Sequence, residues 1–171
     1  MDLKSLILAE HSKAHTLAVA RQIGHDTKQF AALWDLVQNG EPPLPQRASW
    51  IMDACVEAHP TLFEPYLEPA TKALSLPSHN AVHRNLTKIL ARMHIPEELQ
   101  GVLYDHCIQW LIDPAIHVAI KAHCMTIACN IAQGIPELED ELAFVIKDQM
   151  EYNSAGFRAR GRNILRKLKK V

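Results

Sequence analysis

Ten of the 171 residues are histidines, and imidazole is the side chain that most readily binds a metal or transfers a proton near neutral pH. Two pairs are each spaced by four residues, so that each pair would share one face of a helix: His11 with His15, and His79 with His83. A stable zinc site needs three or four ligands, and the chain has no HExxH motif. We therefore expect no metal site.

No arrangement of a nucleophile with a base is recognisable either. Serine, cysteine and histidine are scattered, and no glycine-rich loop is present that could hold a phosphate. The four cysteines form no CxxC pair, which is typical of reduced core residues in a cytosolic protein. The sequence therefore predicts a cytoplasmic, non-catalytic protein without a cofactor, and a small enzyme of unrecognised type is the alternative.

One basic residue recurs at a fixed spacing of 37 residues. If equivalent helices are stacked, these side chains form a row that could bind an acidic peptide or a phosphate backbone. They could instead bond to carbonyl and acidic groups of neighbouring repeats. This basic series consists of Arg47, Arg84, Lys121 and Arg158.

Trp50 follows Arg47 by three residues, so the two side chains share one helical face. An exposed Trp beside an Arg is typical of binding hot spots, and it could also stack on a nucleic-acid base. The alternative is a Trp at the edge of the core, held in place by the Arg. The preceding PPLP, residues 42–45, superficially resembles a proline-rich ligand, but a tight turn between helices explains it better.

Charge is unevenly distributed along the chain. Residues 1–151 hold eleven basic and nineteen acidic residues, a net charge of −8, whereas residues 152–171 hold seven basic residues and no acidic one. Such an end could bind nucleic acid, or it could be a solvated helix face lying over acidic residues. Its basic residues are Arg158, Arg160, Arg162, Arg166, Lys167, Lys169 and Lys170.

The segments that carry these residues have helical signals throughout. Strand-like alternation is absent, and turn residues fall at regular intervals. Pro69 should kink its helix or delay its start, and Ser78 and Asp113 are the expected N-caps of later helices. The predicted helices span about residues 3–23, 27–38, 46–58, 78–93, 97–112, 114–133 and 137–150, followed by a last helix after Asn153 or Ser154.

Four segments align without gaps at the 37-residue period: PQRASWIMDAC, VHRNLTKILAR, AIKAHCMTIAC and GFRARGRNILR. Such self-similarity indicates stacked helical pairs. In the last helix we expect Phe157, Gly161, Ile164, Leu165 and Leu168 to face the preceding repeat, and the outer face to be polar. The first helices follow the period more loosely, at Leu33, Ala70, Cys107 and Phe144.

A proline-bent first helix, with an Arg and then a small residue in the second, resembles HEAT repeats over residues 27–170. HEAT repeats usually also carry an Asp a few residues before the Arg, and only Asp113 comes near that position. The strings RASWIMD, CIQWLID and SAGFRARGRNILRK are similar to a family of small bacterial HEAT-like proteins, seen mainly in the Bacteroidetes. Members sometimes carry the label adenylosuccinate lyase, but the Gly/Ser-rich signature loop of those enzymes is absent from this chain.

The repeat and the resemblance together imply an all-α fold, a right-handed α-α superhelix of the HEAT or armadillo type. A single domain, residues 1–171, would contain an N-terminal helix (1–25) and about four helical hairpin repeats of 37 residues. The expected repeats span residues 27–60, 61–95, 96–133 and 134–171.

This architecture predicts a scaffold or adaptor module that binds a protein or peptide, as a monomer or homodimer, without membrane association. The alternative is nucleic-acid binding through the basic C-terminal helix, as in HEAT-like DNA glycosylases, and a lyase is the third possibility. The candidate binding residues are Arg47, Trp50, Arg84, Lys121, Arg158, Arg162 and Arg166.

Overall fold

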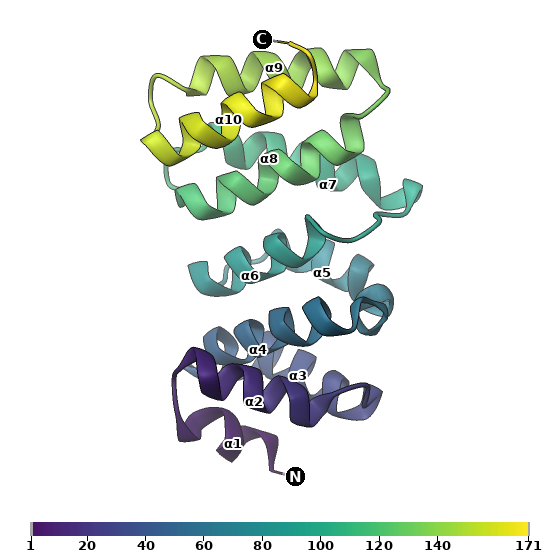
Figure 1. Cartoon of the computed structure of the whole chain (residues 1–171), viewed down its shortest axis with the longest axis vertical. Helices are drawn as coiled ribbons and strands as arrows, with labels where there is room; N and C mark the ends of the chain where they lie inside the picture. Colours follow the sequence, from purple (N-terminus) through teal and green to yellow (C-terminus); the bar gives the residue numbers. More distant parts are fainter. Residues whose placement is uncertain (1, 171) are drawn as a thin grey trace. The chain divides into compact units, whose positions relative to one another are not determined.

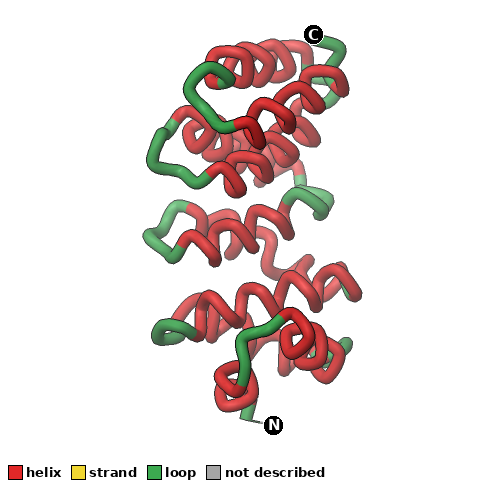
Figure 2. Tube along the Cα trace, turned by 60° about the vertical axis from the view of Figure 1, so that its left-hand side comes forward, coloured by secondary structure: helices red, strands yellow, loops and turns green. Residues whose placement is uncertain are grey.

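The computed structural model describes residues 2–170, which form helices and loops and contain no strand (Figures 1 and 2). The predicted all-α fold of helical repeats is confirmed. The chain divides into two compact units, Met1–Ile89 and Leu90–Val171, and each is described by itself below. The expected division into one domain of four repeats stays a prediction.

Helix α4 lies at the centre of the N-terminal unit, because α3, α2 and α1 all pack against it. The core is apolar and includes Phe30, Leu33, Met52 and Phe63. The helices are α1 (Leu3–Ala9), α2 (Lys13–Ile23), α3 (Thr27–Asn39), α4 (Leu44–Ala58), the 3-10 helix η1 (Pro60–Tyr66), α5 (Leu67–Leu74) and α6 (Asn80–Leu90).

The predicted single helix over residues 3–23 is wrong, because the chain breaks between α1 and α2. Ser12 ends the continuity: its side chain accepts a hydrogen bond from the His15 backbone N–H and caps α2. The imidazole of His15 in turn bonds to the carbonyl oxygen of Leu6 at 2.8 Å, which satisfies an acceptor at the end of α1. Gly24 ends α2 with a positive φ of 54°, as expected for a C-terminal glycine.

Two other helix starts differ from the expected ones. Helix α6 begins at Asn80, where His79 Nδ1, rather than the Ser78 hydroxyl, accepts from the Ala81 N–H at 3.1 Å. Asp113 accepts from the Ala115 N–H, but this bond closes only a turn, and α8 starts five residues after Asp113. Pro69 does not delay its helix, because α5 begins at Leu67 and holds Pro69 in its first turn, where a proline removes no helical hydrogen bond; residues 60–66 before it form a 3-10 helix.

The C-terminal unit consists of two packed pairs of helices (Figure 1). Helix α7 packs against α8 and α9, and α10 packs against α8. The Tyr104 hydroxyl donates to the carbonyl oxygen of Leu138 at 2.9 Å and links the two first helices. The helices are α7 (Glu97–Ile112), α8 (Val118–Ala132), α9 (Pro136–Gln149) and α10 (Ala155–Lys167).

The last helix has the predicted apolar face, since Phe157, Gly161 and the three leucine and isoleucine residues that follow are all buried. The loose period of the first helices, however, fails at Phe144. Leu33, Ala70 and Cys107 are buried, but the Phe144 side chain is 73% exposed. Helix α9 instead buries Leu142, Ala143, Val145 and Ile146.

Candidate functional site

The basic series does not have one common environment. Lys121 is the most enclosed of its residues, with 1% of its surface exposed. Its ammonium donates to Asn153 Oδ1 at 3.3 Å and lies 5.9 Å from the centre of the Phe157 ring. Burial lowers the pKa of Lys121, because a low-dielectric environment disfavours the charged form. This enclosure favours a structural role for Lys121 over binding.

Arg47 and Arg158 each bond to a backbone carbonyl group. Arg47 Nη1 donates to the oxygen of Leu8 at 3.1 Å, in the last turn of α1. Arg158 Nη1 donates to the oxygen of Asn153 at 2.7 Å, just before α10. Carbonyl groups at helix ends and turns have no partner within the helix, so Arg47 joins α4 to the end of α1, and Arg158 stabilises the turn before α10.

Arg84 is different, because its side chain is exposed and its guanidinium has no hydrogen-bond or ion-pair partner among residues 2–170. It lines an open cleft in the N-terminal unit with a volume of about 510 Å³. Two other predicted binding residues, Arg47 and Trp50, line the same cleft. The remaining lining residues are His11, Pro43, Gln46, His79 and Ala81. We call this the Arg47–Arg84 cleft.

The cleft is rich in donors and has no acidic side chain in its lining. The rings of His11 and Trp50 meet edge to face, with their centres 5.5 Å apart. His79 Nδ1 accepts the Ala81 N–H, so the neutral ring carries its proton on Nε2 and can donate it to a ligand. Gln46 also lines the cleft, but its Oε1 is enclosed and has no hydrogen-bond partner within the described chain.

Local structure explains why these side chains meet. The break between α1 and α2 places His11 in the loop against Trp50, whereas a continuous helix would have kept it beside His15. The PPLP turn starts α4 at Leu44 and brings Gln46 and Arg47 into its first turn. Helix α6 begins at Asn80, so both α4 and α6 present their N-terminal ends, which carry positive partial charge, along the cleft.

Two polar links hold α4 and α6 together beneath the cleft. Asn85 Nδ2 donates to Ser49 Oγ at 2.9 Å, and both residues are buried. Lys88 Nζ and Asp53 Oδ2 form an ion pair at 2.6 Å, in which the Asp53 side chain is only 5% exposed. An Asp therefore does join successive second helices here, but it is Asp53 and not Asp113. The links fix the separation of the helices that carry Arg47 and Arg84.

In each of the two histidine pairs, one member bonds to a backbone carbonyl group and the other lines the cleft. The second member of each pair bonds back to a preceding carbonyl group: His15 Nε2 to Leu6 at 2.8 Å, and His83 Nε2 to Leu76 at 3.1 Å. The first member of each pair lines the cleft. The spacing of four residues therefore marked the relevant histidines, but sequence reasoning did not identify His11, His79 or Gln46 as cleft residues, because nothing in the pattern brings 11, 46 and 79 together.

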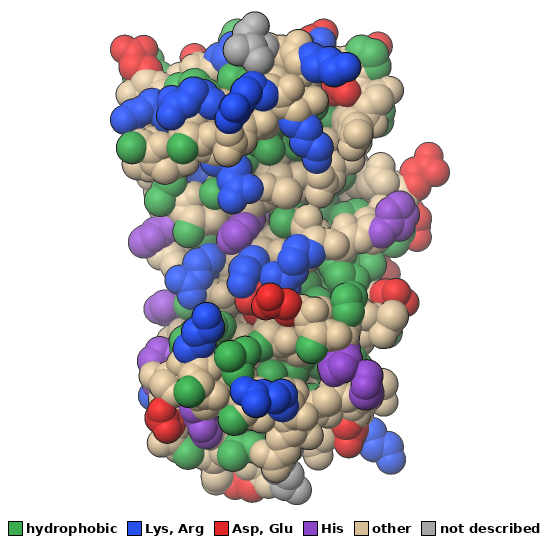
Figure 3. All heavy atoms as spheres, in the orientation of Figure 1, with side chains coloured by type: hydrophobic (Ala, Val, Ile, Leu, Met, Phe, Trp, Pro, Cys, Tyr) green, Lys and Arg blue, Asp and Glu red, His purple; other side chains and the backbone are tan. Residues whose placement is uncertain are grey.

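The basic residues of α10 lie in a row on the surface of the C-terminal unit (Figure 3). Most of them are engaged with neighbours. Arg160 donates to Thr126 and Lys167 to Asn130, both on α8, and Lys170 pairs with Asp140 on α9 at 2.8 Å. Arg166 bonds to Asn163 within its own helix. Arg162 is exposed and has no such partner within residues 2–170.

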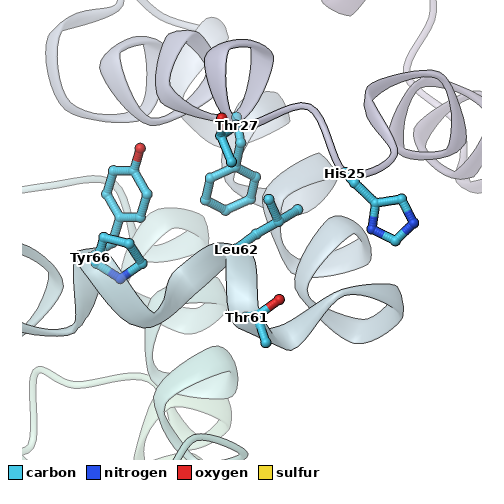
Figure 4. A pocket seen from close by; sticks show the side chains of 7 residues that line it. His25, Thr27, Thr61, Leu62 and Tyr66 are labelled. Carbon is cyan, nitrogen blue, oxygen red and sulfur yellow. The ribbon is translucent and has the colours of Figure 1, made fainter.

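Two further cavities offer less chemistry. One in the N-terminal unit, of about 210 Å³, is lined by Thr27, Thr61, Leu62 and Tyr66 with His25 at its side, and contains no Lys or Arg (Figure 4). The other, of about 530 Å³, lies between α8 and α10 over mostly small residues, with Arg160 and Asn163 as its polar members.

All four cysteines are buried, and burial raises the pKa of the Cys55 thiol to about 12, which disfavours the thiolate. Residues 2–170 contain no group of three or more His, Cys, Asp or Glu side chains that could hold a metal ion. No helix in that range has the length and apolar character needed to cross a bilayer.

Comparison with known proteins agrees with this architecture. No curated protein and no solved structure matches the chain. The model of the HEAT repeat domain family, however, matches residues 3–168, which is almost the whole sequence. The helical pairs, the 37-residue period and this match together show that the chain belongs to the HEAT repeat family.

Proposed function

We propose that this HEAT repeat protein is a non-catalytic binding module that holds a peptide segment of a partner protein in the Arg47–Arg84 cleft. The observation that carries the proposal is the cleft itself: two arginines from α4 and α6 and a Trp line one cavity with no acidic side chain. The exposed Arg84 is central, because its donors are not used within residues 2–170.

The chemistry of the cleft suits a peptide. An unpaired guanidinium can hold a carboxylate with two parallel hydrogen bonds, and a Trp face offers a large apolar contact at low entropic cost. Trp and Arg are also the residues most often found at the energetic centre of protein interfaces. The volume of about 510 Å³ accommodates a few side chains rather than a whole folded surface.

The test compares two arginines of matched exposure. Peptides selected from a random displayed library are measured by fluorescence anisotropy against the wild type, Arg84→Ser and Arg162→Ser. Both substitutions remove one exposed charge, but only Arg84 lines the cleft. Loss of a charge-assisted hydrogen bond should weaken binding about tenfold or more in Arg84→Ser alone. Equal affinities for all three proteins would refute the assignment of the cleft.

Nucleic-acid binding through α10 has less support, because four of the five basic residues in this helix, and Lys170 after it, bond to neighbouring groups. If α10 binds nucleic acid, the affinity for a labelled oligonucleotide should fall steeply with salt. Binding should then weaken in Arg162→Ser rather than in Arg84→Ser. The same two variants therefore separate the two functions.

Four properties expected from the sequence stay predictions: a bacterial origin, a cytoplasmic location, and a monomeric or homodimeric state, together with the absence of lyase activity. Lyase activity is measured directly by the release of fumarate from adenylosuccinate, and we expect no rate above that of buffer.

A further inference from the structure

We propose that the group held in the Arg47–Arg84 cleft is a phosphomonoester on a peptide side chain, a phosphorylated Ser, Thr or Tyr. This inference rests on the proposed function and names the chemistry that its cleft selects.

Charge is the first reason. Arg84 presents its whole guanidinium, and Arg47 keeps donors beyond the Nη1 that is bonded to Leu8. The pair supplies two permanent positive charges, and no acidic side chain lines the cleft to neutralise them. A phosphomonoester carries a charge of about −1.5 to −2 near neutral pH, whereas a carboxylate carries −1, so the phosphate matches the two arginines better. Clusters of arginine are a general means of recognising phosphorylated segments.

The number of donors is the second reason. His79 can add an Nε2–H, because its Nδ1 already accepts from the Ala81 N–H. The N-terminal ends of α4 and α6 also lie along the cleft, and their positive partial charge favours an anion. A phosphate offers three acceptor oxygens to such a set of donors, and a carboxylate offers two.

The apolar part of the cleft indicates that the phosphate is carried by a peptide. A free inorganic phosphate would leave this surface uncovered, whereas a residue beside a phosphorylated side chain can pack against it. Trp50, with His11 against its edge, provides an apolar surface for the residue next to the phosphate.

The test uses four labelled peptide pools that differ only at one fixed central position. This position is phosphorylated (an equal mixture of phosphoserine, phosphothreonine and phosphotyrosine), unphosphorylated, Asp or Ala, and the flanking positions are random. We expect the phosphorylated pool to bind the wild type about tenfold more tightly than any other pool. Arg84→Lys keeps the charge but loses the planar fork, so it should remove most of that preference while the melting temperature stays unchanged. Arg162→Lys is the matched control and should bind as the wild type does.

The outcomes separate this inference from the function on which it rests. If the Asp pool or the unphosphorylated pool binds as tightly as the phosphorylated one and still requires Arg84, the phosphate is refuted and the peptide module stands. If no pool binds, or if binding is the same in Arg84→Ser, both proposals fail. Binding of a labelled RNA oligonucleotide that depends on Arg84 and excludes the phosphorylated pool would also overturn the assignment, in favour of a different class of ligand.

Discussion

Replacing Lys121 by Met should stabilise the protein, although Lys121 is one of the most buried side chains. Met and Lys have similar length and would bury similar apolar surface between α8 and α10, so the hydrophobic contributions nearly cancel. The change therefore isolates the ammonium group. Its environment lowers the pKa of Lys121, mainly through burial, so the charged form is less favourable in the folded protein than in water.

The magnitude follows from the two contacts that the ammonium makes. The hydrogen bond to Asn153 Oδ1 is 3.3 Å long, beyond the usual range, and the Phe157 ring centre lies 5.9 Å away, at the limit of a cation–π contact. Together with the attraction of the Asp113 carboxylate, which also favours the charged form, they contribute about 1–2 kcal/mol. Transfer of a charged group from water into the protein interior costs several kcal/mol, even after the surroundings have relaxed. We therefore expect Lys121→Met to raise the free energy of unfolding by about 1–2 kcal/mol.

The assay is urea unfolding of the wild type and Lys121→Met, followed by far-UV circular dichroism from neutral to alkaline pH. The folded-state pKa of Lys121 lies below its ordinary value of 10.5, so between these two values the unfolded chain binds more protons than the folded one. Stability of the wild type relative to the variant must therefore rise with pH through that window, and the cost of the charge is complete below it. Groups common to both proteins cancel in the difference.

Lys147→Met is the control, because Lys147 is exposed on α9 and has no hydrogen-bond or ion-pair partner within the described chain. Lys147→Met should change the free energy of unfolding by less than about 0.5 kcal/mol. If Lys121→Met instead lowers stability by more than about 1 kcal/mol, the contacts with Asn153 and Phe157 outweigh desolvation and the reasoning is refuted.

Two further predictions concern the packing within each unit. Gly161→Ala would place a Cβ 2.8 Å from Ile146 Cγ2, so α10 must move away from α9; we expect a loss of about 1–3 kcal/mol in the free energy of unfolding, whereas an unchanged value would show that the helices separate freely. Lys88→Met should lower the free energy of unfolding by about 1–2 kcal/mol, because the enclosed Asp53 carboxylate loses one of its partners, the Lys88 ammonium at 2.6 Å. An unchanged free energy of unfolding in Lys88→Met would show that this ion pair contributes nothing.

More of the fold than of the candidate site could be predicted from the sequence. The 37-residue period and the apolar face of the last helix follow from the sequence alone, because periodicity fixes which side chains of one helix point the same way. Helix ends were less predictable. The sequence between Leu3 and Ile23 is helical in composition, and the cap at Ser12 competes successfully with continuation because the end of α1 is satisfied by His15 and Arg47.

Equal spacing also failed to predict equal exposure. Lys121 and Arg84 occupy equivalent positions in their helices, yet one is enclosed by Asn153 and Phe157 from the following segment, and the other is exposed to solvent. Phe144 shares the period of buried Cys107 and is nevertheless exposed. A period fixes the direction of a side chain on its own helix, but exposure depends on what other segments cover it.

The sequence by itself determined the class of the protein: paired helices, a repeated basic residue and membership of a helical-repeat family. Only the tertiary structure decided which basic residues are available. Lys121 and Arg158 bond to groups within the fold. One cleft, by contrast, is lined by Arg47, Trp50, Arg84, His11, Gln46 and His79. The physical reason is that the cleft depends on a broken helix and two helix starts. Contacts between segments distant in the chain, such as Arg47 with Leu8 and Asn85 with Ser49, bring those features together, and one-dimensional spacing does not record such contacts.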